Sequence, residues 1–278
     1  MNMHRVLRRC LVVLASVVAA TVALIQTSSE NRAAAAGQSF VEDFEQFDRA
    51  RWYISHAWSN GAHQNCMWYN RNVKFLSKHQ VELSLTDEHL LDREYTCAEI
   101  RTKEQYGYGI YEVRMRAAEA PGLVSAFFIY AAKSAEVKDQ DEIDIEILGK
   151  DPHSIQLNYF VDGNGDHAAL VPLEFDTSRQ VSDYAFEWLP ESLRWYVNGK
   201  LTREVLASEG HKLPTRPGNI FISIWNGTGP DMESWLQPFK YPGRPLTVVV
   251  ERVAFTEAGK PCQYLGSIVC TLNKSRRE

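Results

Sequence analysis

Short runs in which apolar and polar residues alternate recur through residues 39–256, and they constrain the fold more than any other feature. Clear examples, bounded by Gly, Pro, Asn or Asp, are residues 81–85, 109–115, 193–197 and 246–255. Such alternation is typical of half-buried β-strands, whose successive side chains point to opposite faces of a sheet. No long amphipathic helix interrupts these runs. The sequence therefore predicts one all-β domain built as a sandwich.

A hairpin is indicated where Asn198-Gly199 separates the run 193–197 from Leu201. The Asn-Gly pair accepts the positive φ angles of a type I′ turn, which matches the twist of two antiparallel strands. We therefore expect residues 193–197 to pair with the segment that follows the turn.

Acidic and apolar residues alternate strictly in residues 141–149, Asp-Glu-Ile-Asp-Ile-Glu-Ile-Leu-Gly. In a strand, Glu142, Asp144 and Glu146 share one face, and the three isoleucines share the other. Three neighbouring carboxyl groups cannot all ionise at low cost, so the pKa of at least one is raised. An ionised carboxylate beside a protonated carboxyl is what retaining glycoside hydrolysis requires. The alternatives are a solvated acidic face and a calcium site.

Residues 1–36 have the order of a secretory signal peptide. Three arginines within residues 5–9 precede an uncharged apolar run at residues 11–25, and alanines at 33–36 offer cleavage sites. A membrane span needs about 20 apolar residues, so this run is short for one. We expect a secreted protein, extracellular or periplasmic, without membrane contact after cleavage. An uncleaved anchor is the alternative.

Four cysteines follow this segment, namely Cys66, Cys97, Cys262 and Cys270. Their spacings do not match a zinc site, and an even number in an exported chain indicates disulfides. Three pairings are open to four cysteines. We favour Cys66–Cys97 and Cys262–Cys270, with free buried thiols as the alternative.

The strand of residues 142–146 resembles the Glu-x-Asp-x-Glu signature of glycoside hydrolase family 16. Segments similar to those of bacterial lichenases occur in the same order over residues 40–255. These segments are Asn60-Gly61, Asn65-Cys66, and residues 97–101, 106–112, 125–128, 148–150, 195–199 and 225–229.

The resemblance implies a concanavalin-like β-jelly roll of two curved antiparallel sheets, with a groove on the concave face. It implies that Glu142 is the nucleophile, Glu146 the acid and then the base, and Asp144 the assisting carboxylate. It places eight further residues along the cleft: Asn60, Glu99, Arg101, Phe128, Tyr130, Asn158, Trp225 and Trp235.

Together with the signal-peptide pattern, the resemblance divides the chain into a signal peptide at 1–36, a catalytic domain at 37–256 and a short tail at 257–278. No cofactor is required by this chemistry, and we assign no metal ligands. A structural calcium ion, as in some family members, cannot be placed from the sequence.

The expected partner is a polysaccharide and the expected state is a monomer. The net charge of −5, without a basic stripe, argues against nucleic acid.

Two positions depart from the lichenase pattern: Gln140 stands where lichenases have Trp, and Phe160 where they have Tyr. Residues 61–66, residues 252–259 and the cysteine-containing tail resemble more closely the succinoglycan-cleaving endo-β-glycanases of rhizobia. We therefore expect a secreted retaining endo-β-glycanase that trims an acidic exopolysaccharide. The alternatives are a lichenase acting on mixed-linkage β-1,3-1,4-glucan, a transglycosylase, a non-catalytic lectin-like protein and a calcium-dependent structural module.

Overall fold

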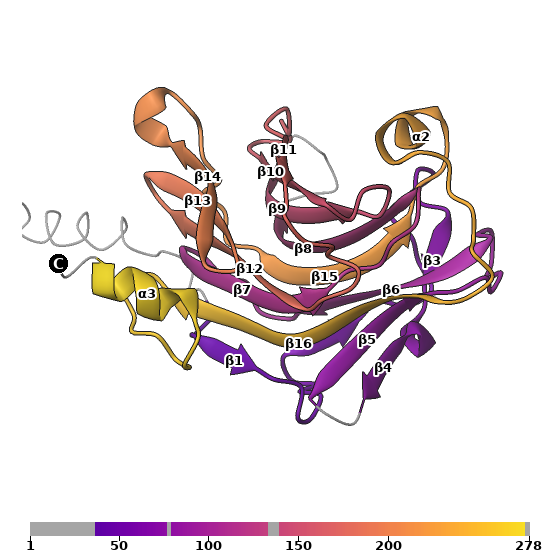
Figure 1. Ribbon diagram of the computed structural model, residues 1–278, viewed down its shortest axis with the longest axis horizontal. Coiled ribbons are helices and arrows are strands. Elements are labelled where there is room, and N and C mark those ends of the chain that lie inside the picture. Colours follow the sequence, from indigo (N-terminus) through magenta and orange to yellow (C-terminus); the bar gives the residue numbers. More distant parts are fainter. Residues whose placement is uncertain (1–36, 77–78, 133–138, 276–278) are drawn as a thin grey trace, which may run out of the picture. The chain divides into compact units, whose positions relative to one another are not determined.

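A computed structural model describes residues 37–76, 79–132 and 139–275, which fold into two curved β-sheets (Figure 1). The predicted signal peptide lies outside the described residues. Each sheet contains eight strands. The prediction of an all-β sandwich of two curved antiparallel sheets is confirmed, with one difference: strand β3 (Cys66–Trp68) pairs in parallel with β6 (Tyr95–Thr102).

One sheet, here called the cleft sheet, carries the acidic strand. Its strands in spatial order are β11 (Ala169–Pro172), β10 (Ser154–Phe160), β9 (Gln140–Leu148), β8 (Leu123–Ala132), β15 (Asn219–Asn226), β6 and β2 (Trp52–Ile54), with β3 paired to β6.

The second sheet, here called the back sheet, covers the opposite side of the core. Its strands in spatial order are β14 (Lys200–Leu206), β13 (Ser192–Val197), β12 (Ser182–Leu189), β7 (Gly109–Arg116), β16 (Leu246–Glu257), β5 (Gln80–Leu85) and β4 (Val73–Leu76), with β1 (Phe40–Glu42) paired to β16. The helices in the described ranges are short: η1 (Asn70–Asn72), η3 (Ala207–Glu209), α2 (Pro230–Leu236) and α3 (Ile268–Ser275).

The core lies between the two sheets and follows from the alternation in the strands. Ile143, Ile145 and Ile147 of β9 are fully buried on its inner face. The back sheet contributes large aromatic side chains, among them Trp195, whose indole N–H donates to the backbone carbonyl of Asp144 at 3.1 Å. This bond crosses the sandwich and ties the middle of the acidic strand to the back sheet.

The predicted hairpin is confirmed at Asn198-Gly199. Both residues have positive φ angles, 48° and 77°, as a type I′ turn requires. Val197 pairs with Lys200 across the turn, which joins β13 to β14.

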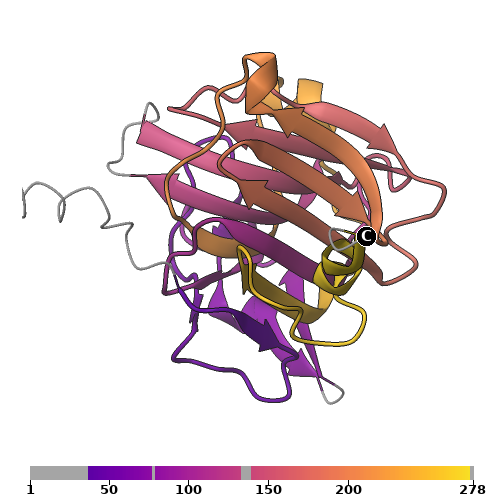
Figure 2. The ribbon, with the colours of Figure 1, turned by 90° about the vertical axis from the view of Figure 1, so that its left-hand side faces the viewer.

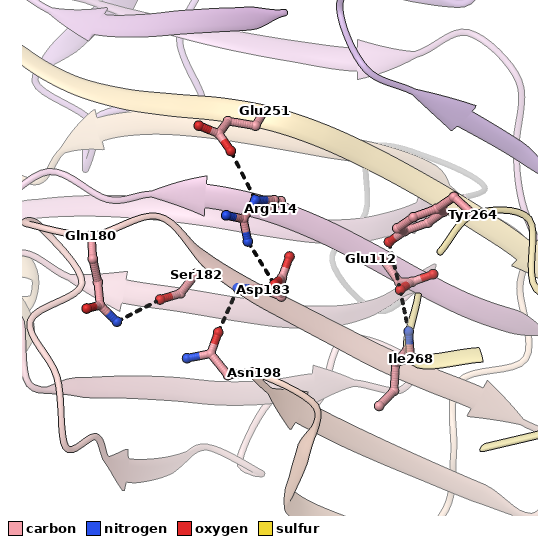
Figure 3. Close-up of polar contacts among 9 residues, drawn as sticks. All are labelled: Glu112, Arg114, Gln180, Ser182, Asp183, Asn198, Glu251, Tyr264 and Ile268. Carbon is pink, nitrogen blue, oxygen red and sulfur yellow. Dashed lines mark hydrogen bonds and ion pairs between the residues drawn. The ribbon is translucent and has the colours of Figure 1, made fainter. Parts of the chain in front are cut away.

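The tail after β16 folds back onto the outward face of the back sheet, where α3 is seen in yellow in Figure 2. Glu112 of β7, 7% exposed, accepts three hydrogen bonds from the tail. The donors are the Tyr264 hydroxyl at 2.9 Å, the Ser267 hydroxyl at 2.8 Å and the Ile268 backbone N–H at 2.9 Å. Figure 3 shows the bonds from Tyr264 and Ile268. A buried carboxylate therefore anchors the tail.

Both disulfides favoured from the sequence are present. Cys66–Cys97 joins β3 to β6. Cys262–Cys270 joins the loop before α3 to a residue of α3 itself. In the part of the chain that the structure describes, no helix is long and apolar enough to cross a membrane.

Candidate active site

Strand β9 presents Gln140, Glu142, Asp144 and Glu146 to a cleft of about 520 Å³ on the outward face of the cleft sheet. The period of two that buries the isoleucines also places these four polar side chains on the other face. The residues that line the cleft are Trp58, Asn60, His63, Glu99, Ala126, Phe128, Tyr130, Gln140, Glu142, Asp144, Glu146, Phe221, Ser223 and Trp225.

Strand register arranges the cleft floor in rows that run across the sheet. In the row of Glu146, Gln156 of β10 lies on one side and Ala126 of β8 on the other, followed by Ser223 and Glu99. Three strand spacings of about 4.8 Å separate Glu146 from Glu99. Because the side chains between them are small, this part of the floor is open to a substrate.

The next row contains Asp144, with Asn158 on one side and Phe128, Phe221 and Arg101 on the other. The rings of Phe128 and Phe221 stack with centroids 4.8 Å apart. Arg101 covers the ring of Tyr53 at 4.8 Å. An apolar patch therefore borders the carboxyl groups, and a cation lies at its far end.

Each glutamate of β9 receives a hydrogen bond from a glutamine side chain. The Gln140 amide donates to Glu142 Oε2, and the Gln156 amide donates to Glu146 Oε2, the latter at 2.6 Å. The indole N–H of Trp235 donates to Gln156 Oε1 at 3.0 Å. Trp235 therefore acts on Glu146 through Gln156.

Burial dominates the electrostatics of these carboxyl groups. It raises the pKa of Glu142 to about 7, against the opposing effects of the hydrogen bonds from Gln140 and Asp144. It also raises the pKa of Glu146 to about 7; the hydrogen bond from Gln156 opposes this rise, and the charge of Glu142 adds to it.

The pKa of Asp144 is raised well above its ordinary value by its burial, by the charges of Glu142 and Glu146, and by its hydrogen bond with Glu142. Asp144 therefore stays protonated, and its hydroxyl donates a hydrogen bond to Glu142. Ionised Glu142 then has two donors, from Gln140 and Asp144, whereas Glu146 has one. This difference in hydrogen bonding favours the charge on Glu142 over a charge on Glu146.

A fourth carboxyl group lies on the cleft floor. Glu99 is 2% exposed, and burial raises its pKa to about 7, opposed by the hydrogen bond from Ser55 and by the charge of Arg101. The Ser55 hydroxyl donates to Glu99 Oε1 at 2.5 Å. At this pKa Glu99 can serve a sugar hydroxyl as acceptor or donor.

The Asn60 loop is held by a buried glutamine. Gln64 Oε1 accepts from the Asn60 backbone N–H at 3.3 Å, and its amide donates to the Cys66 carbonyl at 2.9 Å. Since Cys66 is bonded to Cys97, the disulfide fixes this loop beside the strand that carries Glu99.

Five of the eight residues that the resemblance assigned to substrate binding line the cleft: Asn60, Glu99, Phe128, Tyr130 and Trp225. The other three, Arg101, Asn158 and Trp235, lie next to the lining. Asn158 is 7% exposed beside Asp144, and its Oδ1 has no hydrogen-bond partner among the described residues. Trp235 packs against Trp225, with ring centroids 6.2 Å apart.

Sequence reasoning missed several residues at this site: Trp58, His63, Gln140 as a contact of Glu142, Gln156, Phe221 and Ser223. Phe221 and Ser223 could have been found, because they alternate with Trp225 along one strand. Gln156 could not, because only the register of β10 against β9 places it beside Glu146.

The acidic strand does not gather ligands for a metal ion. Within residues 37–76, 79–132 and 139–275, no group of three or more His, Cys, Asp or Glu side chains could hold one. The carboxyl groups that line the cleft can transfer protons and attack as nucleophiles.

Comparisons with known proteins agree with this geometry. The sequence profile described as "Glycosyl hydrolases family 16" matches residues 60–241. The chain is 39% identical over 241 residues to endo-1,3-1,4-beta-glycanase ExoK of Rhizobium meliloti (strain 1021), covering 87% of each chain. It is 40% identical over 200 residues to the beta-glucanase of Bacillus subtilis (strain 168), covering 72% of this chain and 79% of that one. The solved beta-glucanase of Bacillus licheniformis superposes with a TM-score of 0.73 at 37% identity, covering 80% of this chain and 99% of the other.

Proposed function

The chain belongs to glycosyl hydrolase family 16 and is a glycoside hydrolase, and from this premise we propose that it is a secreted, retaining endo-β-glycanase. In this proposal Glu142 is the nucleophile, Glu146 the general acid and base, and Asp144 the carboxyl that holds Glu142 in place. The observation that carries the proposal is the unequal hydrogen bonding of the two glutamates: Glu142 has two donors, and Glu146 has one.

The reaction takes place in two displacements. A carboxylate oxygen of Glu142 attacks the anomeric carbon while the bond to the leaving oxygen breaks, and the Glu146 carboxyl gives its proton to that oxygen. Glu146 then accepts a proton from water, whose oxygen attacks the same carbon. The glycosyl ester bond to Glu142 breaks, and the carboxylate is restored with the anomeric configuration retained.

Binding would use the side chains around this pair. Asn60 and Glu99 offer hydrogen bonds to sugar hydroxyls, and the flat faces of Trp58 and Trp225 suit stacking against sugar rings. Arg101, Asn158 and Trp235 lie next to this lining. The proposed substrate-binding set consists of these three residues and the five predicted ones that line the cleft, Asn60, Glu99, Phe128, Tyr130 and Trp225.

For the substrate, we propose the β-glucosidic backbone of an acidic exopolysaccharide such as succinoglycan, trimmed to shorter chains. Similarity to the ExoK endo-1,3-1,4-beta-glycanase over 87% of the chain supports this choice, as do Gln140 and the cysteine-containing tail. The second candidate is mixed-linkage β-1,3-1,4-glucan, favoured by 40% identity to a Bacillus beta-glucanase.

We also propose the division into a signal peptide at 1–36, a catalytic domain at 37–256 and a tail at 257–278. The two disulfides support export, because such bonds persist in oxidising compartments. No cofactor enters the proposed reaction.

The test is a side-by-side digestion of succinoglycan and barley β-glucan by the chain from Gly37 onward, with Glu142→Gln as control. Chain length is followed by size-exclusion chromatography, and new reducing ends are followed by a colorimetric assay. Faster shortening of succinoglycan supports the exopolysaccharide proposal. Fast cleavage of barley glucan with succinoglycan untouched selects the mixed-linkage activity. Binding to either polymer without new reducing ends contradicts the enzymatic proposal.

A further inference from the structure

Gln140 occupies the first position of β9 and lies on the same face as Glu142, two residues further along the strand. Its backbone is fixed on both sides. The Gly163 N–H donates to the Gln140 carbonyl at 2.8 Å, and Gln140 pairs with Ala132 of β8. The side chain is partly buried at the cleft lining, so its position relative to Glu142 is set by the strand.

The contact is directional. The Gln140 amide N–H donates to Glu142 Oε2, and an amide donor stabilises a carboxylate more than a neutral carboxyl or an ester. With the opposite amide orientation, two oxygen acceptors would face each other. Ionised Glu142 therefore favours the amide orientation in which the Gln140 N–H points to it, and this donor in turn stabilises the ionised form of Glu142.

We propose that Gln140 is a positioning residue for the nucleophile: its amide holds Glu142 as a carboxylate aimed into the cleft and stabilises that carboxylate again when the glycosyl ester breaks. This inference rests on the proposed function, in which Glu142 forms the ester. It assigns a role to the position at which this chain departs from the lichenase pattern.

The other groups around Glu142 do not take over this role. On β8 the opposite residue is Tyr130, whose pKa is raised by burial and by the charge of Glu142. On β10 it is Phe160, which carries no charge. On β9 itself the neighbours are Asp144, which donates to the same carboxyl, and Glu146, which is acidic. Gln140 is therefore a donor to Glu142 whose side chain does not titrate, in contrast to Tyr130 and Asp144.

A matched contact exists at the other glutamate. Gln156 donates to Glu146 Oε2 and is itself oriented by Trp235, because an indole N–H can only donate. The two glutamines therefore act on different carboxyl groups. Removal of the Gln140 amide should change the ionisation of Glu142, and removal of the Gln156 amide should change that of Glu146.

The experiment is the pH profile of kcat/KM on a soluble β-glucan for the wild type, Gln140→Leu and Gln156→Leu. Gln140→Leu should raise the midpoint of the acidic limb by about one pH unit and lower kcat/KM about tenfold below that midpoint. The basic limb should stay in place. Gln156→Leu should move the basic limb upward and leave the acidic limb unchanged.

Gln180→Leu is the matched control. The Gln180 amide lies just before β12 of the back sheet and donates to the Ser182 hydroxyl at 3.3 Å (Figure 3). Gln180 does not line the cleft. Its profile should coincide with that of the wild type. Gln140→Met serves the same test if Gln140→Leu does not fold. Superimposable profiles for the wild type and both Gln140 variants would overturn the inference. A wild-type protein that cuts no β-glucan would instead overturn the proposed function.

Discussion

Carboxyl groups lie on both outward faces of the sandwich, buried at Glu112 and half-buried at Glu142 and Glu146, and their surroundings differ. On the back sheet, burial raises the pKa of Glu112, while three donors from the tail surround its two oxygens. On the cleft sheet, burial raises the pKa of Glu142 and Glu146 to about 7, and their donors are side chains of the same sheet. No ion pair joins either glutamate to a cation among the described residues.

The difference shows that a raised pKa alone does not identify a catalytic group. Glu112 also borders a cavity, of about 210 Å³, but three donors from the tail hold its two oxygens, so its carboxylate serves the structure. Glu142 and Glu146 line a cavity of about 520 Å³ and keep an open side for a substrate. A buried carboxyl that is only partly satisfied and faces a cavity is the candidate for chemistry.

The largest expected effect is that of Glu142→Gln, which should lower kcat/KM on β-glucan by roughly four orders of magnitude or more, because an amide cannot form the glycosyl ester. Glu112→Gln is the matched control. It makes the same chemical change at the other buried site, keeps one acceptor oxygen and should change kcat/KM less than about twofold. Reducing-end assays measure kcat/KM for both variants. Equal losses of kcat/KM would contradict the assignment of Glu142 as the catalytic group and Glu112 as a structural one.

Glu146→Ala should lower polymer hydrolysis by roughly 10²–10⁴-fold, the usual contribution of a general acid. An aryl glycoside with an activated leaving group needs little protonation, so its first step should be spared. Pre-steady-state release of the aryl group, compared with polymer cleavage, measures the difference. An equal loss on both substrates would remove Glu146 from the acid role.

Glu112→Ala should destabilise the fold by about 2–3 kcal/mol, because three donors, two of them buried, lose their acceptor. Cleavage at the cleft should be unaffected well below the melting temperature. Thermal unfolding and limited proteolysis of the tail test this prediction. An unchanged melting temperature would mean that the tail is not anchored through Glu112.

The smallest expected effect is a loss of folding stability with rising pH, caused by the ionisation of Glu142 and Glu146. The folded-state pKa values of Glu142 and Glu146 lie above the ordinary value of 4.5, so their contribution is present below about pH 4.5 and is lost as the pH rises through about 7. The Glu142→Gln, Glu146→Gln double variant should therefore gain on the order of 1 kcal/mol over the wild type between pH 4.5 and 8, after allowance for partial solvent exposure. Melting temperatures across that range measure the gain; a gap that widens toward low pH would have the wrong sign.

Parts of both sheets could be predicted from local pattern. The alternation in residues 141–149 was sufficient to place the three carboxyls on one face and the isoleucines in the core, and Asn198-Gly199 was sufficient for its hairpin. The relay from Trp235 through Gln156 to Glu146 was not accessible, because it depends on strand register and on a helix far along the chain. The anchoring of the tail was missed for the same reason: Glu112 is one polar residue in an alternating run, and its donors follow more than 150 residues later.

The central claim is that Glu142 forms a covalent glycosyl intermediate, and trapping tests it most directly. The protein is incubated with a β-glucooligosaccharide that carries a 2-fluoro substituent and an activated leaving group, then digested and mapped by mass spectrometry. The account predicts a stable adduct on the peptide of β9 at Glu142, while the unsubstituted substrate yields the β-anomer first. An adduct on Glu146, or initial release of the α-anomer without any adduct, would contradict it.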